Sequence, residues 1–181
     1  MTQDKLSETI LLPAGCEFKQ DKTQITVKGP KGEITRKLPD PDLKIKIGKE
    51  ELTLEYMKTS RREKNKIFTT KAHIKNMLQG VTEGYIYTLK VCSGHFPMSV
   101  SIKNDTFEIK NFVGEKVPRT LKIKKGAEVK LTGDIITVYS HDKEIAGQIA
   151  GSIEKLTRRP GFDKRIFQDG IYITDKNGKK V

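Results

Sequence analysis

Residues 158–165 are the stretch best suited to chemistry with a polyanion, and they read RRPGFDKR. Arg158 and Arg159 supply two guanidinium groups, which bind phosphates through paired hydrogen bonds and do not lose their charge. A proline–glycine pair then turns the chain sharply, and Lys164 and Arg165 continue the positive charge. Arginine beside an aromatic residue on an irregular loop suits RNA, which is read by shape, stacking and phosphate contact. We therefore predict that this segment binds RNA.

Two roles are open for Phe162 within this segment. Its ring can stack on an RNA base, or it can fill the hinge between a preceding helix and a following strand, and we favour the hinge. Two carboxylates nearby, Asp163 and Asp169, are expected to orient Arg165 or to cap turns rather than to face phosphate.

Positive charge is concentrated in two parts of the chain. The formal net charge is +12, and a surplus of Lys and Arg favours polyanionic partners because neutralised phosphates release condensed counterions. Residues 58–75 hold seven Lys/Arg and one Glu, and residues 155–181 hold eight Lys/Arg and three Asp. The remaining residues hold 20 basic and 19 acidic side chains, so they are almost neutral. Two solvated surface regions would also explain this pattern.

Further RNA contacts are predicted in both basic regions. Residues 61–66, RREKNK, show no apolar periodicity, which indicates an exposed loop before a helix. RNA, protein and solvent all remain open as the partner of that loop. Residues 176–181 are expected to form a mobile tail. The additional predicted contacts are Lys155, Lys176, Lys179 and Lys180 in the second region and Arg61, Arg62 and Lys64 in the first.

Catalytic and metal-binding chemistry finds no support in the sequence. The three histidines form no metal-binding pair at short spacing. Residues 92–95, CSGH, look nucleophilic, but neighbours on a strand point to opposite faces and no buried carboxylate is indicated, so a turn with a polar cap is the better explanation. The turns at 29–32 and 177–180 do not match a phosphate-binding loop. We predict a protein that is not an enzyme and has no cofactor or small-molecule substrate, a hypothesis that a pocket with a paired histidine and carboxylate would challenge.

A membrane partner is not expected either. No segment approaches the ~20 apolar residues of a spanning helix, and the first eight residues lack the basic start and apolar core of a signal peptide. Cys16 and Cys92, far apart in sequence, could pair, but without an export signal reduced and buried thiols in the cytoplasm are the better interpretation. A scaffold that binds an acidic protein remains the main alternative to RNA binding.

An internal duplication sets the positions of these segments. Three short segments recur in the same order, at offsets of 82, 84 and 86 residues: 27–33 with 109–115, 52–54 with 136–138, and 84–88 with 170–174. Such a pattern indicates a repeated unit with small loop insertions. We therefore divide the chain into domains 1–84 and 85–181.

Each repeat reads as several strands, then one helix, then a strand. Apolar spacings of three and four predict one helix around 67–81 and another over 143–156. Alternating polar and apolar residues predict strands at 24–28, 33–38, 43–47, 52–56 and 85–91, and again at 100–103, 107–110, 121–124, 129–131, 135–139 and 171–173. The predicted fold class is α+β, with two tandem duplicated domains, each a mainly antiparallel sheet packed against one helix.

Three of these segments resemble one known family. Residues 163–172, DKRIFQDGIY, resemble the C-terminal signature of the archaeal and eukaryotic branch of the universal large-subunit ribosomal protein family six. The turn at 27–32 resembles that family's first-domain motif, and residues 82–85 resemble its helix-to-strand junction. With the duplication, the resemblance covers nearly the whole chain. Bacterial members end differently, and the richness in Lys, Ile and Glu is similar to archaeal members.

The resemblance implies two similar α+β domains and binding to large-subunit ribosomal RNA, chiefly through the second domain. It also implies a place in the cytoplasmic ribosome near the base of the stalk that recruits translational GTPases. The sarcin–ricin loop, the subunit interface and the ribosomal proteins of the stalk base would be close by. Carried over by position, the resemblance favours Arg158, Arg159, Lys164 and Arg165 as contacts to ribosomal RNA.

Overall fold

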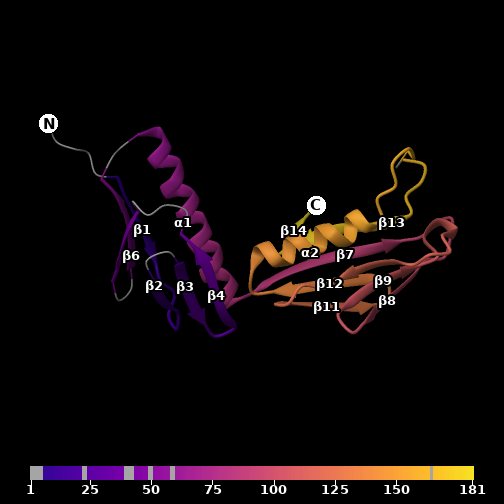
Figure 1. Cartoon of the computed structure of the whole chain (residues 1–181), viewed down its shortest axis with the longest axis horizontal. Coiled ribbons are helices and arrows are strands. Elements are labelled where there is room, and N and C mark those ends of the chain that lie inside the picture. The colour runs from indigo at the N-terminus through magenta and orange to yellow at the C-terminus, as the bar shows by residue number, and fades with distance from the viewer. Residues whose placement is uncertain (1–5, 22–23, 39–42, 49–50, 58–59, 164) are drawn as a thin grey trace. The chain divides into compact units, whose positions relative to one another are not determined.

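Two separate hydrophobic cores divide the chain into two units, Met1–Gly84 and Tyr85–Val181. The computed structural model describes residues 6–21, 24–38, 43–48, 51–57, 60–163 and 165–181. Each unit combines antiparallel strands with one long helix, as Figure 1 shows. The expected α+β fold with two duplicated domains is thus confirmed.

Unit 1 places its helix against two three-stranded antiparallel sheets. The sheets have the orders β1-β6-β5 and β2-β3-β4, and the helix α1 contacts strands of both. One apolar face of α1 supplies Ile67, Ile74, Leu78 and Val81 to the core. The elements are β1 (Leu6–Leu11), β2 (Glu17–Asp21), β3 (Gln24–Gly29), β4 (Gly32–Lys37), β5 (Lys44–Ile47), β6 (Glu51–Tyr56) and α1 (Arg61–Thr82).

Unit 2 repeats this plan and extends it. Its sheets have the orders β10-β9-β8 and β11-β12-β7-β13-β14, and the helix α2 packs on the larger one through Ala146, Ile149, Ala150 and Ile153. The elements are β7 (Tyr85–Cys92), β8 (Ser99–Lys103), β9 (Thr106–Lys110), the 3-10 turn η1 (Phe112–Gly114), β10 (Arg119–Lys122), β11 (Ala127–Thr132), β12 (Ile135–Ser140), α2 (Lys143–Leu156), β13 (Gly170–Lys176) and β14 (Lys179–Lys180).

The duplication is visible in the strand orders. The set β1-β6-β5 corresponds to β7-β12-β11, and the sheet of β2, β3 and β4 corresponds to that of β8, β9 and β10. The strands β13 and β14 have no counterpart in the described part of unit 1. The expectation of a final strand after each helix holds only for unit 2, because the strand that follows α1 is β7, the central strand of the second unit's larger sheet.

Two predicted irregular segments are regular instead. Residues 61–66 form the first turns of α1 rather than a loop, and Ser60 caps this helix by accepting a hydrogen bond from Arg62 N and bonding with Glu63. The described segment 176–181 forms a hairpin rather than a mobile tail, because Asn177 and Gly178 both adopt positive φ and join β13 to β14. A Ser-x-x-Glu capping box and an Asn-Gly pair are the signals that predict these two structures.

The turn between β3 and β4 lies against the C-terminal end of α1. Lys31 N donates to Val81 O at 2.9 Å, and Lys31 Nζ donates to Glu83 O. A Cβ atom at Gly29 would lie 2.6 Å from Val81 Cγ2 and 3.0 Å from Val81 O. Glycine is therefore required at this position because the strand and the helix approach too closely for a side chain.

We expect Gly29→Ala to lower the free energy of unfolding of unit 1 by about 2 kcal/mol, the usual cost of overpacking. Gly151→Ala is the control, because Gly151 lies inside α2 with no atom within 4 Å of an added Cβ. That variant should be neutral or more stable by up to about 1 kcal/mol. Urea unfolding followed by circular dichroism measures both, and equal stabilities for the two variants would contradict the close approach.

Candidate nucleic-acid interface

The candidate site is the loop at residues 157–169, which joins α2 to β13 and is named here the basic loop (Figure 1). Thr157 holds its two ends together. The Thr157 hydroxyl donates to Glu154 O at 3.0 Å and accepts from Ile171 N at 3.0 Å. Because this side chain is buried, the loop starts and ends at fixed points although most of its residues are exposed.

Asp169 anchors the far end of the basic loop to the segment between β7 and β8. Its carboxylate accepts hydrogen bonds from Gly94 N, from His95 N at 3.0 Å and from His95 Nδ1 at 2.8 Å, and its side chain is only 6% exposed. Burial alone would raise the pKa of Asp169, but the hydrogen bonds from His95 and Gly94 outweigh it and hold this pKa below its ordinary value. The carboxylate therefore stays charged and keeps the loop attached at neutral pH.

This arrangement revises the interpretation of residues 92–95. The expectation that no buried carboxylate lies near them is wrong, because Asp169 is buried and bonded to His95. The interpretation as a turn with a polar cap is confirmed by the two backbone N–H groups that Asp169 binds. In the described residues no side chain hydrogen-bonds His95 Nε2, so the pair anchors a loop and lacks the nucleophile that a catalytic histidine would activate. Among the same residues no group of His, Cys, Asp and Glu is arranged to hold a metal ion.

A row of stacked groups runs along the basic loop. The rings of His95 and Phe167 lie 5.3 Å apart, Phe167 and Phe162 meet edge to face at 5.0 Å, and the Arg159 guanidinium lies 4.0 Å from the centre of the Phe162 ring. Phe162 is 39% exposed and lies outside the core of unit 2. The expectation that Phe162 fills the hinge between helix and strand is therefore wrong. Its ring packs against Phe167 and Arg159 within the loop.

The cations of the loop differ in how they are held. Asp163 orients Arg165, as expected, by accepting from its backbone N at 2.9 Å and from Nη2 at 2.8 Å, while the Arg165 side chain stays 90% exposed. These hydrogen bonds lower the pKa of Asp163 and raise that of Arg165. Arg158 and Lys155 are exposed and have no ion pair within the described chain. Lys164 lies outside the described residues.

Arg119, which lies outside the basic loop, stabilises the point where the loop begins. Arg119 donates through Nε and Nη2 to both oxygens of Glu115, at 2.7 and 2.6 Å, and through Nη1 to Leu156 O at 2.5 Å. Its guanidinium also lies 4.4 Å from the centre of the Phe112 ring. These hydrogen bonds lower the pKa of Glu115. Arg119 thus joins the segment after β9 to the C-terminal end of α2, where the basic loop begins. Sequence reasoning missed this role, because Arg119 lies in neither basic region.

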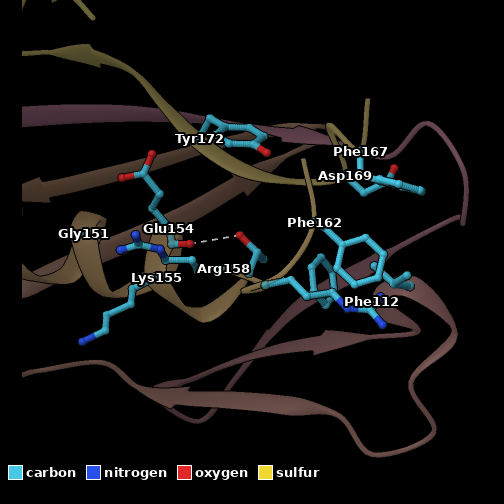
Figure 2. A pocket seen from close by; sticks show the side chains of 12 residues that line it. Phe112, Gly151, Glu154, Lys155, Arg158, Phe162, Phe167, Asp169 and Tyr172 are labelled. Carbon is cyan, nitrogen blue, oxygen red and sulfur yellow. Dashed lines mark hydrogen bonds between the residues drawn. The ribbon is translucent and has the colours of Figure 1, made fainter. Parts of the chain in front are cut away.

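The loop, α2 and β13 enclose a cavity of about 440 Å³, shown in Figure 2. Four aromatic residues line it, together with three of the predicted RNA contacts. The lining consists of Phe112, Val113, Gly151, Glu154, Lys155, Thr157, Arg158, Arg159, Phe162, Phe167, Asp169 and Tyr172. Sequence reasoning did not identify this cavity, because its walls combine residues 112–113 with residues 151–172, two regions that are distant along the chain.

The predicted RNA contacts fall into three groups in the structure. The first group lies in or next to the basic loop: Arg158, Arg159 and Arg165 belong to the loop, and Lys155 lies in the last turn of α2 just before it. The lysines of the β13–β14 hairpin, Lys176, Lys179 and Lys180, lie at the other end of β13, about 20 Å away along the strand. The third group, Arg61, Arg62 and Lys64, is exposed on the first turns of α1 in unit 1. The C-terminal basic region is therefore two separate surfaces.

Comparisons with known proteins agree with this architecture. A family model described as "Ribosomal protein L6" matches the chain twice, over residues 12–84 and 96–170. The chain is 41% identical to the large ribosomal subunit protein uL6 of Methanobrevibacter smithii, over 94% of this chain and 96% of that protein. It is 40% identical to the protein of the same name from Haloarcula marismortui, over 91% and 93% of the two chains. Within the described residues, no helix is long and apolar enough to cross a membrane.

Proposed function

Because the chain belongs to the ribosomal protein L6 family, we propose that its second unit binds large-subunit ribosomal RNA through the basic loop. Members of this family are structural, non-catalytic constituents of the large ribosomal subunit. The observation that carries the proposal is the anchoring of the loop at Thr157 and Asp169, because this single fixed loop carries the exposed residues Arg158, Arg159 and Arg165. Fixed cations bind phosphate with less loss of side-chain and backbone freedom than cations on a mobile tail.

Further contacts extend this interface. The hairpin lysines Lys176, Lys179 and Lys180 form a second cationic surface of unit 2 and reach phosphates that the loop does not. Arg61, Arg62 and Lys64 give unit 1 a third contact, at the N-terminal end of α1. We further propose a place near the base of the GTPase-recruiting stalk, beside the sarcin–ricin loop and the subunit interface, with the ribosomal proteins of the stalk base as neighbours, as the resemblance of residues 163–172 to the family's C-terminal signature implies.

Sedimentation and RNA binding test the proposal at two levels. The protein should co-sediment with large ribosomal subunits from native lysate, and its absence from them would overturn the ribosomal assignment. The double variant Arg158→Ala with Arg165→Ala should bind a large-subunit rRNA fragment about tenfold more weakly, and the slope of log affinity against log salt should fall by about two.

The control removes the same charge from another surface of unit 2. Lys125 and Lys130 are exposed and lie near and on β11, away from the loop. The variant Lys125→Ala with Lys130→Ala should keep an affinity and a salt slope close to those of the unchanged protein. Equal effects of the two double variants would mean that net charge, and not the basic loop, determines binding.

A further inference from the structure

The cavity under the basic loop has the composition of a site for one small planar ligand. Its volume of about 440 Å³ lies in the range of small-molecule sites. Phe112 is nearly fully buried and forms part of its floor, while Phe162 and Phe167 are partly exposed at its mouth. Aromatic rings of this kind bind nucleobases because every base offers a π face. Gly151 keeps one side open, since no atom lies within 4 Å of the place where a side chain would begin.

Two polar groups on the cavity wall, the Glu154 carboxylate and the Tyr172 hydroxyl, are suited to hydrogen-bond the edge of a base. Glu154 Oε1 accepts from Ile173 N at a long 3.4 Å, and within the described chain no hydrogen bond is formed by Glu154 Oε2 or by the Tyr172 hydroxyl. Burial and then the negative charges nearby raise the pKa of Tyr172, so its hydroxyl remains a donor at neutral pH. Figure 2 shows Glu154 and Tyr172 along one side of the cavity and Phe162 and Phe112 on the other.

The rim of the cavity is cationic. Lys155 and Arg158 follow Glu154 on and just beyond the last turn of α2, and neither forms an ion pair within the described residues. Arg159 covers one face of Phe162 and adds its charge to the same rim. Aromatic walls with cations at the edge match a nucleotide, whose base is planar and apolar on its faces and whose phosphates are anionic.

We propose that this cavity takes the base of one unstacked guanosine nucleotide of ribosomal RNA, with the flanking phosphates on Arg158 and Lys155. A carboxylate accepts hydrogen bonds only, and guanine presents two adjacent donor groups, N1–H and N2–H₂, to the Glu154 carboxylate. Adenine presents one donor group beside an acceptor. The proposal rests on the RNA binding proposed above and adds to it a base-reading site. RNA is the source of the nucleotide because the rim cations can hold two successive phosphates, which a free mononucleotide does not have.

Short RNA hairpins with one bulged nucleotide test the proposal, with the full chain as the binding partner. A bulged guanosine should raise the affinity about tenfold over the same hairpin without a bulge, and a bulged adenosine or an abasic site should raise it less. Phe162→Ala should remove most of that gain. Ile166→Ala is the control, because Ile166 is an exposed apolar residue of the same loop that does not line the cavity, and it should keep the gain. Glu154→Gln keeps the acceptor for Ile173 N and should abolish the preference for guanosine over adenosine.

Two outcomes would overturn the proposal, and a third would overturn the RNA-binding function on which it rests. If the bulge adds no affinity while Arg158→Ala with Arg165→Ala still weakens hairpin binding, the loop binds RNA but the cavity reads no base. If 5′-guanosine monophosphate binds the protein as tightly as the bulged hairpin does, the cavity serves a free nucleotide instead of RNA. If the unbulged hairpin binds with an affinity that the loop arginines do not affect, the RNA-binding function proposed for the loop fails as well.

Discussion

Asp169→Ala is expected to weaken binding to large-subunit ribosomal RNA by about thirtyfold, although it removes a negative charge beside a cationic surface. Coulomb's law alone predicts the opposite, a gain in affinity. The Asp169 carboxylate, however, is buried and holds the segment at Gly94 and His95 to the end of the basic loop. Its loss releases the loop, so that every cation on it must be ordered again when RNA binds. The free energy of unfolding of unit 2 should fall by about 2 kcal/mol for the same reason.

Asp163→Ala is the matched control, because it makes the same change of charge in the same loop. The Asp163 carboxylate bonds only with Arg165 in the described residues, and its loss frees that guanidinium for phosphate. RNA affinity should therefore stay unchanged or rise slightly. Filter binding at several salt concentrations, with urea unfolding of each variant, separates the cases. A gain in affinity for both variants would show that charge outweighs loop anchoring.

Arg119→Ala is expected to lower the free energy of unfolding of unit 2 by about 3 kcal/mol. The Arg119 side chain is 24% exposed and holds both oxygens of Glu115 and the Leu156 carbonyl oxygen. Its removal leaves three acceptor oxygens without their donor where the basic loop begins. Glu115 is 37% exposed, so water partly replaces the lost ion pair and keeps the loss below the value for a fully buried pair.

Two comparisons distinguish this structural arginine from the arginines proposed to bind RNA. Arg119→Lys keeps the charge but cannot reproduce the planar fork that holds Glu115 and Leu156 together, so it should recover less than half of the stability. Arg158→Ala should leave stability unchanged, because Arg158 has no ion pair in the described chain. Thermal unfolding by calorimetry measures all three variants. An Arg119→Ala protein with unchanged stability would contradict the role assigned to these contacts.

Local periodicity predicts most of the fold. The alternation in β3, β6, β9 and β12 and the apolar faces of α1 and α2 are visible in the sequence because one side of each element is buried. The strands β1 and β2 were missed. Residues 17–21 contribute only Phe18 to the core, so this strand shows little alternation to detect. The pairing of β7 with β12 and β13 could not be predicted, because strand pairing over a long sequence separation depends on the whole sheet.

The candidate site was predicted less completely than the fold. Charge and turn chemistry identify the basic loop, and the prediction that Asp163 orients Arg165 is confirmed. The bond between Asp169 and His95 joins residues 74 positions apart, and nothing local to either residue indicates it. The contacts of Arg119 with Leu156 span 37 positions and are equally invisible to a local pattern. Both of these long-range contacts depend on tertiary packing, which brings distant segments together only after the sheets have formed.

The place of β7 between β12 and β13 determines when the loop proposed to bind RNA can reach its folded form during protein synthesis. Unit 1 contains all of its own strands, so it can fold once its residues have been synthesised. The larger sheet of unit 2 must wait, because β7 pairs with β13, as in the bond between Thr174 and the Thr88 carbonyl, 86 positions apart. A nascent chain that stops before residue 170 has the loop arginines but lacks β13, and Thr157 then has no Ile171 N to hold the two ends of the loop together. The loop proposed to bind RNA is therefore the last part of the chain to reach its folded form.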